Sequence, residues 1–125
     1  MNTIQKALDI SNKAAAVGFD WPSPMAVLDK VVEELAEIRQ ALYKGESKDR
    51  VAEEVGDLFF ALVNFNRKMQ IDSEQAFLAG TEKFDRRYQK LCEVIEESGH
   101  HPADLDSDSL EAVWQTIKME EKNAQ

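Results

Sequence analysis

Cysteine and histidine are scarce in this sequence. There is one cysteine, Cys92, and the only two histidines are adjacent, at positions 100 and 101. A single cysteine excludes an intrachain disulfide and a cysteine-rich metal site. Two neighbouring histidines exclude most histidine-based catalysis and most zinc sites. We therefore look for function among the carboxylates, which are abundant.

The sequence also has few positive charges and no long apolar run. Lys and Arg number 15 against 24 Asp and Glu, which gives a net charge of −9. Such a surface argues against binding nucleic-acid polymers or anionic membranes, although a small anionic ligand can still be held through metal ions. The longest strongly apolar run, residues 58–63, is too short to span a membrane, and the charged N-terminal segment does not resemble a signal peptide. The expectation is a soluble cytoplasmic protein.

Helix breakers are few and clustered, which predicts long helices with few joints. The chain has five glycines and three prolines. Capping residues predict helices that start at Ser23–Pro24, at Ser47, at Asp72 with Gln75, and at Asp108 with Glu111. The first sixteen residues also have a helical pattern, and no segment alternates like a strand. The predicted fold class is all-α.

We expect a helical bundle of about five helices, built around an antiparallel pair, with three long helices at its centre. Residues 1–125 are read as a single domain with a core of about residues 18–118. The tail from residue 118 to 125 is expected to fray.

A local repeat is the most informative feature of the sequence. Residues 29–38 read DKVVEELAEI and residues 49–58 read DRVAEEVGDL, so that four of ten positions are identical at an offset of twenty. The two copies fall on successive helices joined by a short turn, which predicts that these helices run antiparallel.

Each copy of the repeat carries two carboxylates three residues apart, beside the apolar stripe of its helix. If the two flanks meet, four carboxylates converge: Glu34, Glu37, Glu54 and Asp57. Like charges at such density require a counter-cation, and Mg²⁺ and Mn²⁺ prefer oxygen ligands. Iron is disfavoured because neither helix carries a histidine. The alternative is that both pairs belong to solvated helix faces, which are common.

Basic and aromatic residues allow two interpretations each. Lys30 and Arg50 precede Glu34 and Glu54 by four residues, a spacing typical either of intrahelical salt bridges or of a cationic edge that grips a polyphosphate. The candidates on the third long helix are Lys83 and Arg87, also four residues apart. Trp21 and Trp114 are candidates for core anchors or for stacking on a ligand.

Taken together, these motifs resemble the MazG family of nucleoside triphosphate pyrophosphohydrolases. The resemblance rests on the paired acidic motif Glu34-x-x-Glu37 and Glu54-x-x-Asp57. It extends to GFDWP at 18–22, EEVGDLFFALVNFNRK at 53–68, KFDRRY at 83–88 and LEAVW at 110–114. The sequence is most similar to the second, active domain of the tandem MazG enzymes.

The resemblance implies an all-α enzyme that hydrolyses a nucleoside triphosphate to the monophosphate and pyrophosphate, by attack of a metal-activated water at the α-phosphorus. It implies Mg²⁺, with Mn²⁺ as a substitute, on the catalytic and metal-binding residues Glu34, Glu37, Glu54 and Asp57. It implies phosphate binding by Lys30, Arg50, Lys83 and Arg87, and base binding by Trp114. Arg50 departs from the family, in which lysine is usual, and this chain has one such domain rather than two.

Charge favours at least two Mg²⁺ ions, because one ion on four carboxylates would still repel a triphosphate. The alternative substrates are dCTP, dUTP and phosphoribosyl-ATP. An alternative from another class is a non-catalytic acidic helical module that binds a basic partner. We also expect a homo-oligomer, at least a dimer, with Phe59, Phe60 and Val63 in its interface or in the inner core.

Overall fold

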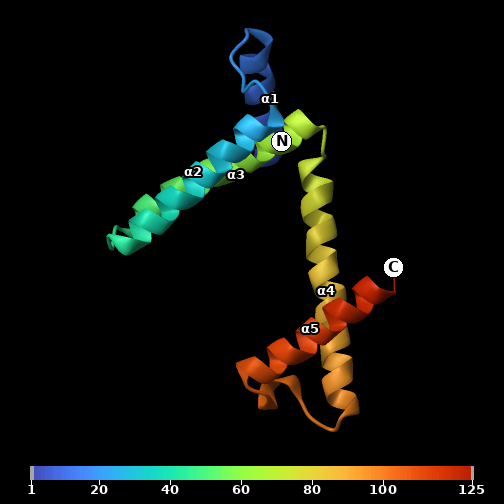
Figure 1. Ribbon diagram of the computed structural model, residues 1–125. Helices are drawn as coiled ribbons and strands as arrows, with labels where there is room; N and C mark the ends of the chain where they lie inside the picture. The colour runs from blue at the N-terminus through green and yellow to red at the C-terminus, as the bar shows by residue number, and fades with distance from the viewer. Residues whose placement is uncertain (1, 125) are drawn as a thin grey trace. The chain divides into compact units, whose positions relative to one another are not determined.

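The computed structural model describes residues 2–124, and these form helices and connecting turns without a strand, so the all-α prediction is confirmed. The elements, drawn in Figure 1, are α1 (Thr3–Ala16), α2 (Pro24–Tyr43), α3 (Lys48–Met69), α4 (Ser73–Glu97), a 3₁₀ helix (Pro102–Asp104) and α5 (Ser107–Asn123). None of these helices is long and apolar enough to cross a membrane.

The predicted start signals of the three long helices are confirmed by their capping bonds. The Ser23 hydroxyl accepts a hydrogen bond from the Ala26 amide at 3.2 Å, and Ser47 does the same for the Arg50 amide at 3.2 Å. Asp72 accepts from the Gln75 amide at 2.9 Å. Each bond satisfies an amide at the start of a helix that has no intrahelical partner.

The last helix differs from its prediction at its start. Asp106, not Asp108, is the cap: its carboxylate accepts from the Ser109 amide at 2.8 Å. Asp108 lies in the first turn instead, where its negative charge interacts favourably with the helix dipole. Helix α5 continues to Asn123, fraying of the tail stays a prediction, and residue 125 lies outside the described residues.

Contacts divide the described chain into two compact units, one up to Ala76 and one from Phe77 onward. In the first unit, α2 and α3 lie side by side and antiparallel, and α1 packs against α3 (Figure 1). Half of the buried residues of this pair are polar, and two of the others are alanines: Val27, Glu34, Ala41, Glu54, Ala61 and Asn64. The antiparallel arrangement predicted from the repeat is therefore confirmed.

The second unit has its own small core, where α4 and α5 pack together. Its buried residues are Leu91, Ile95 and Ile117, with Leu110, Val113 and Trp114 packed against them. The sequence suggested that all three long helices form one centre. By its contacts α4, apart from its first turn, belongs to the same unit as α5, and the single centre stays a prediction.

The loop between α1 and α2 is tied to the end of α3 by a charged cluster. Asp20 forms ion pairs with Arg67 and with Lys68, the latter at 3.2 Å. Arg67 also donates from Nε to the fully buried Asn64 at 3.0 Å. The hydrogen bond from Arg67, reinforced by Lys68, lowers the pKa of Asp20 from its usual 3.8 to about 2.

This cluster predicts a pH-dependent contribution to stability. Because the folded state lowers the pKa of Asp20, the contribution is complete above about pH 4 and is lost as pH falls towards 2. One pKa unit corresponds to about 1.4 kcal/mol, so we expect Asp20→Asn to lower the free energy of unfolding at pH 7 by about 1–2 kcal/mol after solvent screening.

Urea unfolding at several pH values measures this difference. The stabilities of wild type and Asp20→Asn should converge as pH falls from 4 to about 2. Asp29→Asn, at an exposed carboxylate of the same unit, serves as the control. A difference that stays constant down to pH 2 would contradict the assignment.

Candidate functional site

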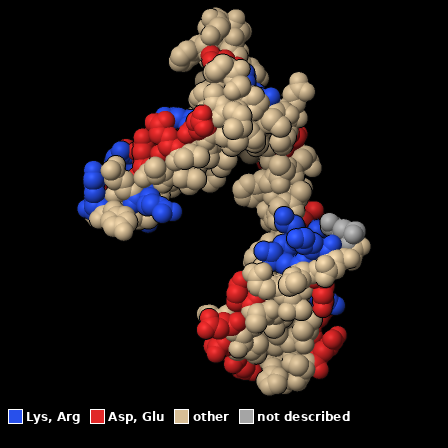
Figure 2. Space-filling view, in the orientation of Figure 1, with Lys and Arg blue, Asp and Glu red and all other residues tan. Residues whose placement is uncertain are grey.

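The acidic repeat places three carboxylates together between α2 and α3. Ligand oxygens of Glu34, Glu54 and Asp57 all lie within 4.8 Å of one another. Glu34 is 3% exposed and Glu54 is 4% exposed, whereas Asp57 is open to solvent. We call these three residues the carboxylate triad. In Figure 2, acidic side chains gather along the α2–α3 pair.

Both buried glutamates are held in the same way. Lys30 contacts Oε1 of Glu34 at 3.1 Å, and Arg50 forms an ion pair with Oε1 of Glu54. The other oxygen of each carboxylate, Oε2, is buried and has no hydrogen-bond partner within residues 2–124. A buried charged oxygen without a partner is costly, so both atoms mark a place that suits a cation.

The intrahelical salt bridges considered for Lys30 and Arg50 are present in the structure. Their partner glutamates raise the pKa of Lys30 and of Arg50, chiefly because Lys30 donates a hydrogen bond to Glu34 and Arg50 donates one to Glu54. The two cations therefore offset two of the triad's three negative charges. Phosphate binding by either residue would require it to exchange a carboxylate for a phosphate.

Glu37, the fourth predicted carboxylate, is outside the triad but close to it. Its pKa is raised to about 7, first by the neighbouring Glu54 carboxylate, then by burial and by Glu34. The same interaction, together with Arg50, lowers the pKa of Glu54. Glu37 is thus the carboxylate of this cluster that most readily carries a proton.

A hard divalent ion fits the donors of the triad. All of its donors are carboxylate oxygens, which Mg²⁺ and Mn²⁺ prefer over softer ligands. Two of its residues, Glu34 and Glu54, also have one buried carboxylate oxygen without a hydrogen-bond partner, as described above. Within residues 2–124, no other cluster of His, Cys, Asp or Glu brings three ligand atoms this close together.

The second unit contains an aromatic cavity of about 980 Å³. Its lining includes Phe84, Tyr88 and Trp114, and two cations, Arg87 and Lys118. The Trp114 ring lies 5.1 Å from that of Phe84, tilted by 43°, and Trp114 also packs on the small core. Trp114 therefore serves as a core anchor and also lines a space that an aromatic base can enter.

The remaining predicted residues are less enclosed. Lys83 is exposed on α4, four residues before Arg87. Trp21 is half-buried in the loop before α2, next to the Asp20 cluster. On α3, Phe59 and Phe60 are exposed, whereas Val63 is half-buried.

Sequence reasoning missed two residues at the end of α5. Lys118 lines the cavity with Arg87, and the Arg87 guanidinium donates from Nε to Glu121 at 2.8 Å. These residues lie more than thirty positions after Arg87, and neither belongs to a local pattern. The sequence shows only that Lys118 and Glu121 are charged. Which charges come into contact depends on how α4 and α5 pack, and the sequence does not show this.

Comparison with known proteins gives one consistent result. Residues 23–92 match the MazG nucleotide pyrophosphohydrolase domain, which is more than half of the chain. A nucleoside triphosphate pyrophosphohydrolase/pyrophosphatase MazG of Thermotoga maritima is 36% identical over 115 residues, 92% of this chain and 44% of the relative. A nucleoside triphosphate pyrophosphohydrolase of Escherichia coli K12 is 35% identical over 122 residues, 94% of this chain and 45% of the relative.

The chain thus spans less than half the length of these two curated relatives. The matched segment includes α2, α3 and most of α4, and therefore all four carboxylates of the acidic repeat. The resemblance inferred from the sequence motifs is confirmed, and the chain belongs to the family of MazG nucleotide pyrophosphohydrolase domains.

Proposed function

We propose that this chain hydrolyses nucleoside triphosphates to nucleoside monophosphate and pyrophosphate. Water adds its oxygen to the α-phosphorus, and the bond from that phosphorus to the bridging oxygen of the β-phosphate breaks. The observation that carries the proposal is the pair of buried, unpartnered Oε2 atoms in Glu34 and Glu54, on the acidic repeat of a MazG domain. The names of the two relatives support the same activity.

We propose that Glu34, Glu54 and Asp57 hold Mg²⁺, with Glu37 as the fourth acidic residue and Mn²⁺ as a substitute metal. When bound, the metal neutralises phosphate charge and lowers the pKa of water. The carboxylates orient the site because two of them are buried and are fixed through their other oxygen. Glu37, with its raised pKa, is suited to exchange a proton close to the reaction.

Four cations and an aromatic ring are proposed for phosphate and base binding. Lys83 and Arg87 stabilise negative charge on the departing pyrophosphate. Lys30 and Arg50, which pair with Glu34 and Glu54 in the free chain, would bind phosphate oxygens by exchanging a carboxylate for a phosphate. Trp114 provides a face for the base, which fits its place in the wall of the aromatic cavity.

Two alternatives make different predictions. A relative specialised for dCTP, dUTP or phosphoribosyl-ATP would use the same metal chemistry and would differ only in a substrate panel. A non-catalytic acidic module would need no buried carboxylates, because a basic partner binds exposed charge. The burial of Glu34 and Glu54 therefore favours the enzyme.

The metal assignment predicts the behaviour of ligand variants. We expect Glu54→Gln and Asp57→Asn each to reduce activity about 100-fold or more, since loss of a direct ligand should exceed the roughly 10–100-fold cost of losing its supporting partner. Mg²⁺ should raise the melting temperature of wild type and have little effect on either variant. Without metal, Asp57→Asn should melt at or above wild type, because it relieves like-charge repulsion.

Asp29→Asn is the matched control, since Asp29 lies on α2 but is exposed and outside the triad. Differential scanning fluorimetry with and without Mg²⁺, paired with pyrophosphate release, gives both quantities. Full activity of Glu54→Gln or Asp57→Asn at saturating Mg²⁺ would exclude that residue as an essential ligand.

The position of bond cleavage is tested with isotopic water. In ¹⁸O-water, the label should appear in the nucleoside monophosphate, because attack is at the α-phosphorus. The sequence has no glycine-rich phosphate loop of the kind that enzymes cutting at the γ-phosphate often use. Mass spectrometry of the products decides the point, and label in orthophosphate with accumulation of diphosphate would refute the proposed reaction.

We also propose that the chain forms a homo-oligomer, at least a dimer. Large apolar side chains remain exposed on the α2–α3 pair, including Val32 at 64% and Phe59 at 59%. Monomeric proteins rarely leave apolar surface of this extent uncovered. A second copy of the chain is the proposed cover.

Light scattering at micromolar concentration should therefore give a mass of at least twice 14.2 kDa. Phe59→Glu should lower the measured mass, because it places a charge in the proposed interface. Val17→Glu, at an exposed apolar residue that follows α1, should leave the mass unchanged. A wild-type mass of a single chain would contradict the proposal.

A further inference from the structure

The Arg87 side chain is held by a residue that belongs to none of the sequence motifs. Its Nε atom donates to Oε2 of Glu121, in the last turns of α5, at 2.8 Å. The Arg87 side chain is only 19% exposed, and that of Glu121 is 41% exposed. Nη1 and Nη2 of Arg87 form no hydrogen bond with other residues of the described chain, 2–124.

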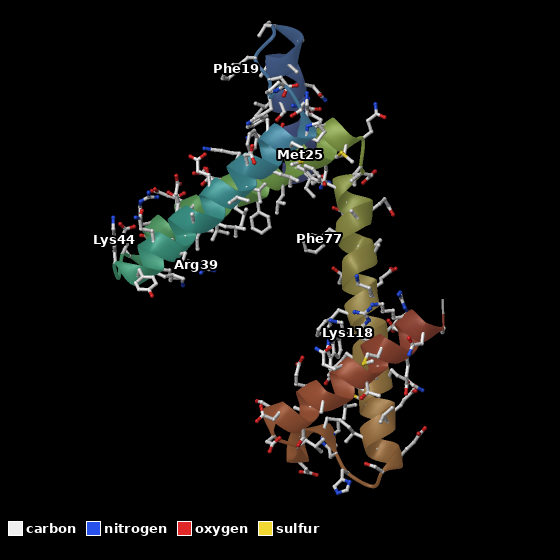
Figure 3. All side chains as sticks on the ribbon, in the orientation of Figure 1. Phe19, Met25, Arg39, Lys44, Phe77 and Lys118 are labelled. Carbon is white, nitrogen blue, oxygen red and sulfur yellow. The ribbon has the colours of Figure 1, made fainter. Side chains whose placement is uncertain are left out.

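The two partners differ in their relation to the aromatic cavity. Arg87 lines it, as does Lys118, which precedes Glu121 by three residues on α5. Glu121 is not part of the lining. Figure 2 shows Lys and Arg gathered where α5 crosses α4, and Figure 3 labels Lys118 at this crossing. A ligand in the cavity would thus meet Arg87 and Lys118, but not Glu121.

We propose that Glu121 is a positioning residue for phosphate binding. It holds Arg87 through Nε, and so keeps the two terminal nitrogens available to phosphate oxygens of a nucleotide or of pyrophosphate. This inference rests on the proposed function, because it assumes that Arg87 contacts substrate phosphate. It adds to that function a residue on α5, outside the segment that matches the family.

The physical reason lies in the flexibility of arginine. A free arginine loses much rotational freedom when it grips a phosphate, and its planar fork binds two oxygens well only in the correct orientation. A carboxylate that fixes the side chain beforehand removes part of that cost. The negative charge of Glu121 also repels phosphate, but water screens it, because the side chain is partly exposed and lies outside the cavity.

A double-mutant cycle separates positioning from a general role in stability. We expect Glu121→Ala to lower kcat/KM for the triphosphate by about three- to tenfold, and to weaken inhibition by pyrophosphate by a similar factor, as expected when one ordered side chain becomes mobile. In the Arg87→Ala background, which itself should lose about 10–1000-fold, the same change should have less than about a twofold effect.

Conservative variants and a neighbour sharpen the test. Glu121→Asp or Glu121→Gln should recover part of the loss, because each keeps an oxygen that accepts from Nε. Glu120→Ala removes an adjacent exposed carboxylate and should match wild type. Melting temperatures of all variants, measured in parallel, show whether α5 remains folded.

Three results would overturn the inference: unchanged or improved kcat/KM in Glu121→Ala, an equal loss with and without Arg87, or an equal loss in Glu120→Ala. Failure of the proposed function looks different. In that case the wild-type chain itself releases no pyrophosphate from any triphosphate of a panel, and both the function and the role of Glu121 fall together.

Discussion

Burial of ionised carboxylates is the constraint around which the first unit is organised. A buried carboxylate loses its hydration, and only a cation or several donors can replace what water supplied. In Glu34 and Glu54 only one of the two carboxylate oxygens has a cationic partner. Lys30 pairs with one oxygen of Glu34 and Arg50 with one oxygen of Glu54, and the second oxygen of each has no partner. A fold selected for stability alone would place apolar side chains there. The two carboxylate oxygens without a partner fit a protein that binds a metal ion.

Two regular helices place the side chains of this cluster at fixed positions. Two long helices, each started by a serine cap, bring the two copies of the repeat to the same level of an antiparallel pair. A helix fixes side chains three and four residues apart on one face, so one short pattern sets both the cation and the carboxylate. The repeat at an offset of twenty therefore places a cation and its carboxylates on each of the two facing helices.

Local patterns explain which features could be predicted from the sequence. Caps, helix ends and the triad depend on spacings of three or four residues, or on one short turn. The pairing of Asp20 with Arg67 spans 47 residues, and that of Arg87 with Glu121 spans 34. Such pairs depend on how helices pack, which charge alone does not indicate. The prediction of Asp108 as the cap failed for a smaller reason, since Asp106, the actual cap, suits a helix start equally well and lies two positions earlier.

The ion pairs also change the expected charge balance of the site. Four bare carboxylates require two divalent ions to reach neutrality, which was the argument from sequence. With Lys30 and Arg50 in place, one divalent ion would balance the two remaining negative charges. If both cations turn to a bound triphosphate, the carboxylates lose that compensation and the need for a second ion returns. The charge balance of the site therefore depends on whether Lys30 and Arg50 pair with the carboxylates or with phosphate, and this cannot be read from the carboxylate count alone.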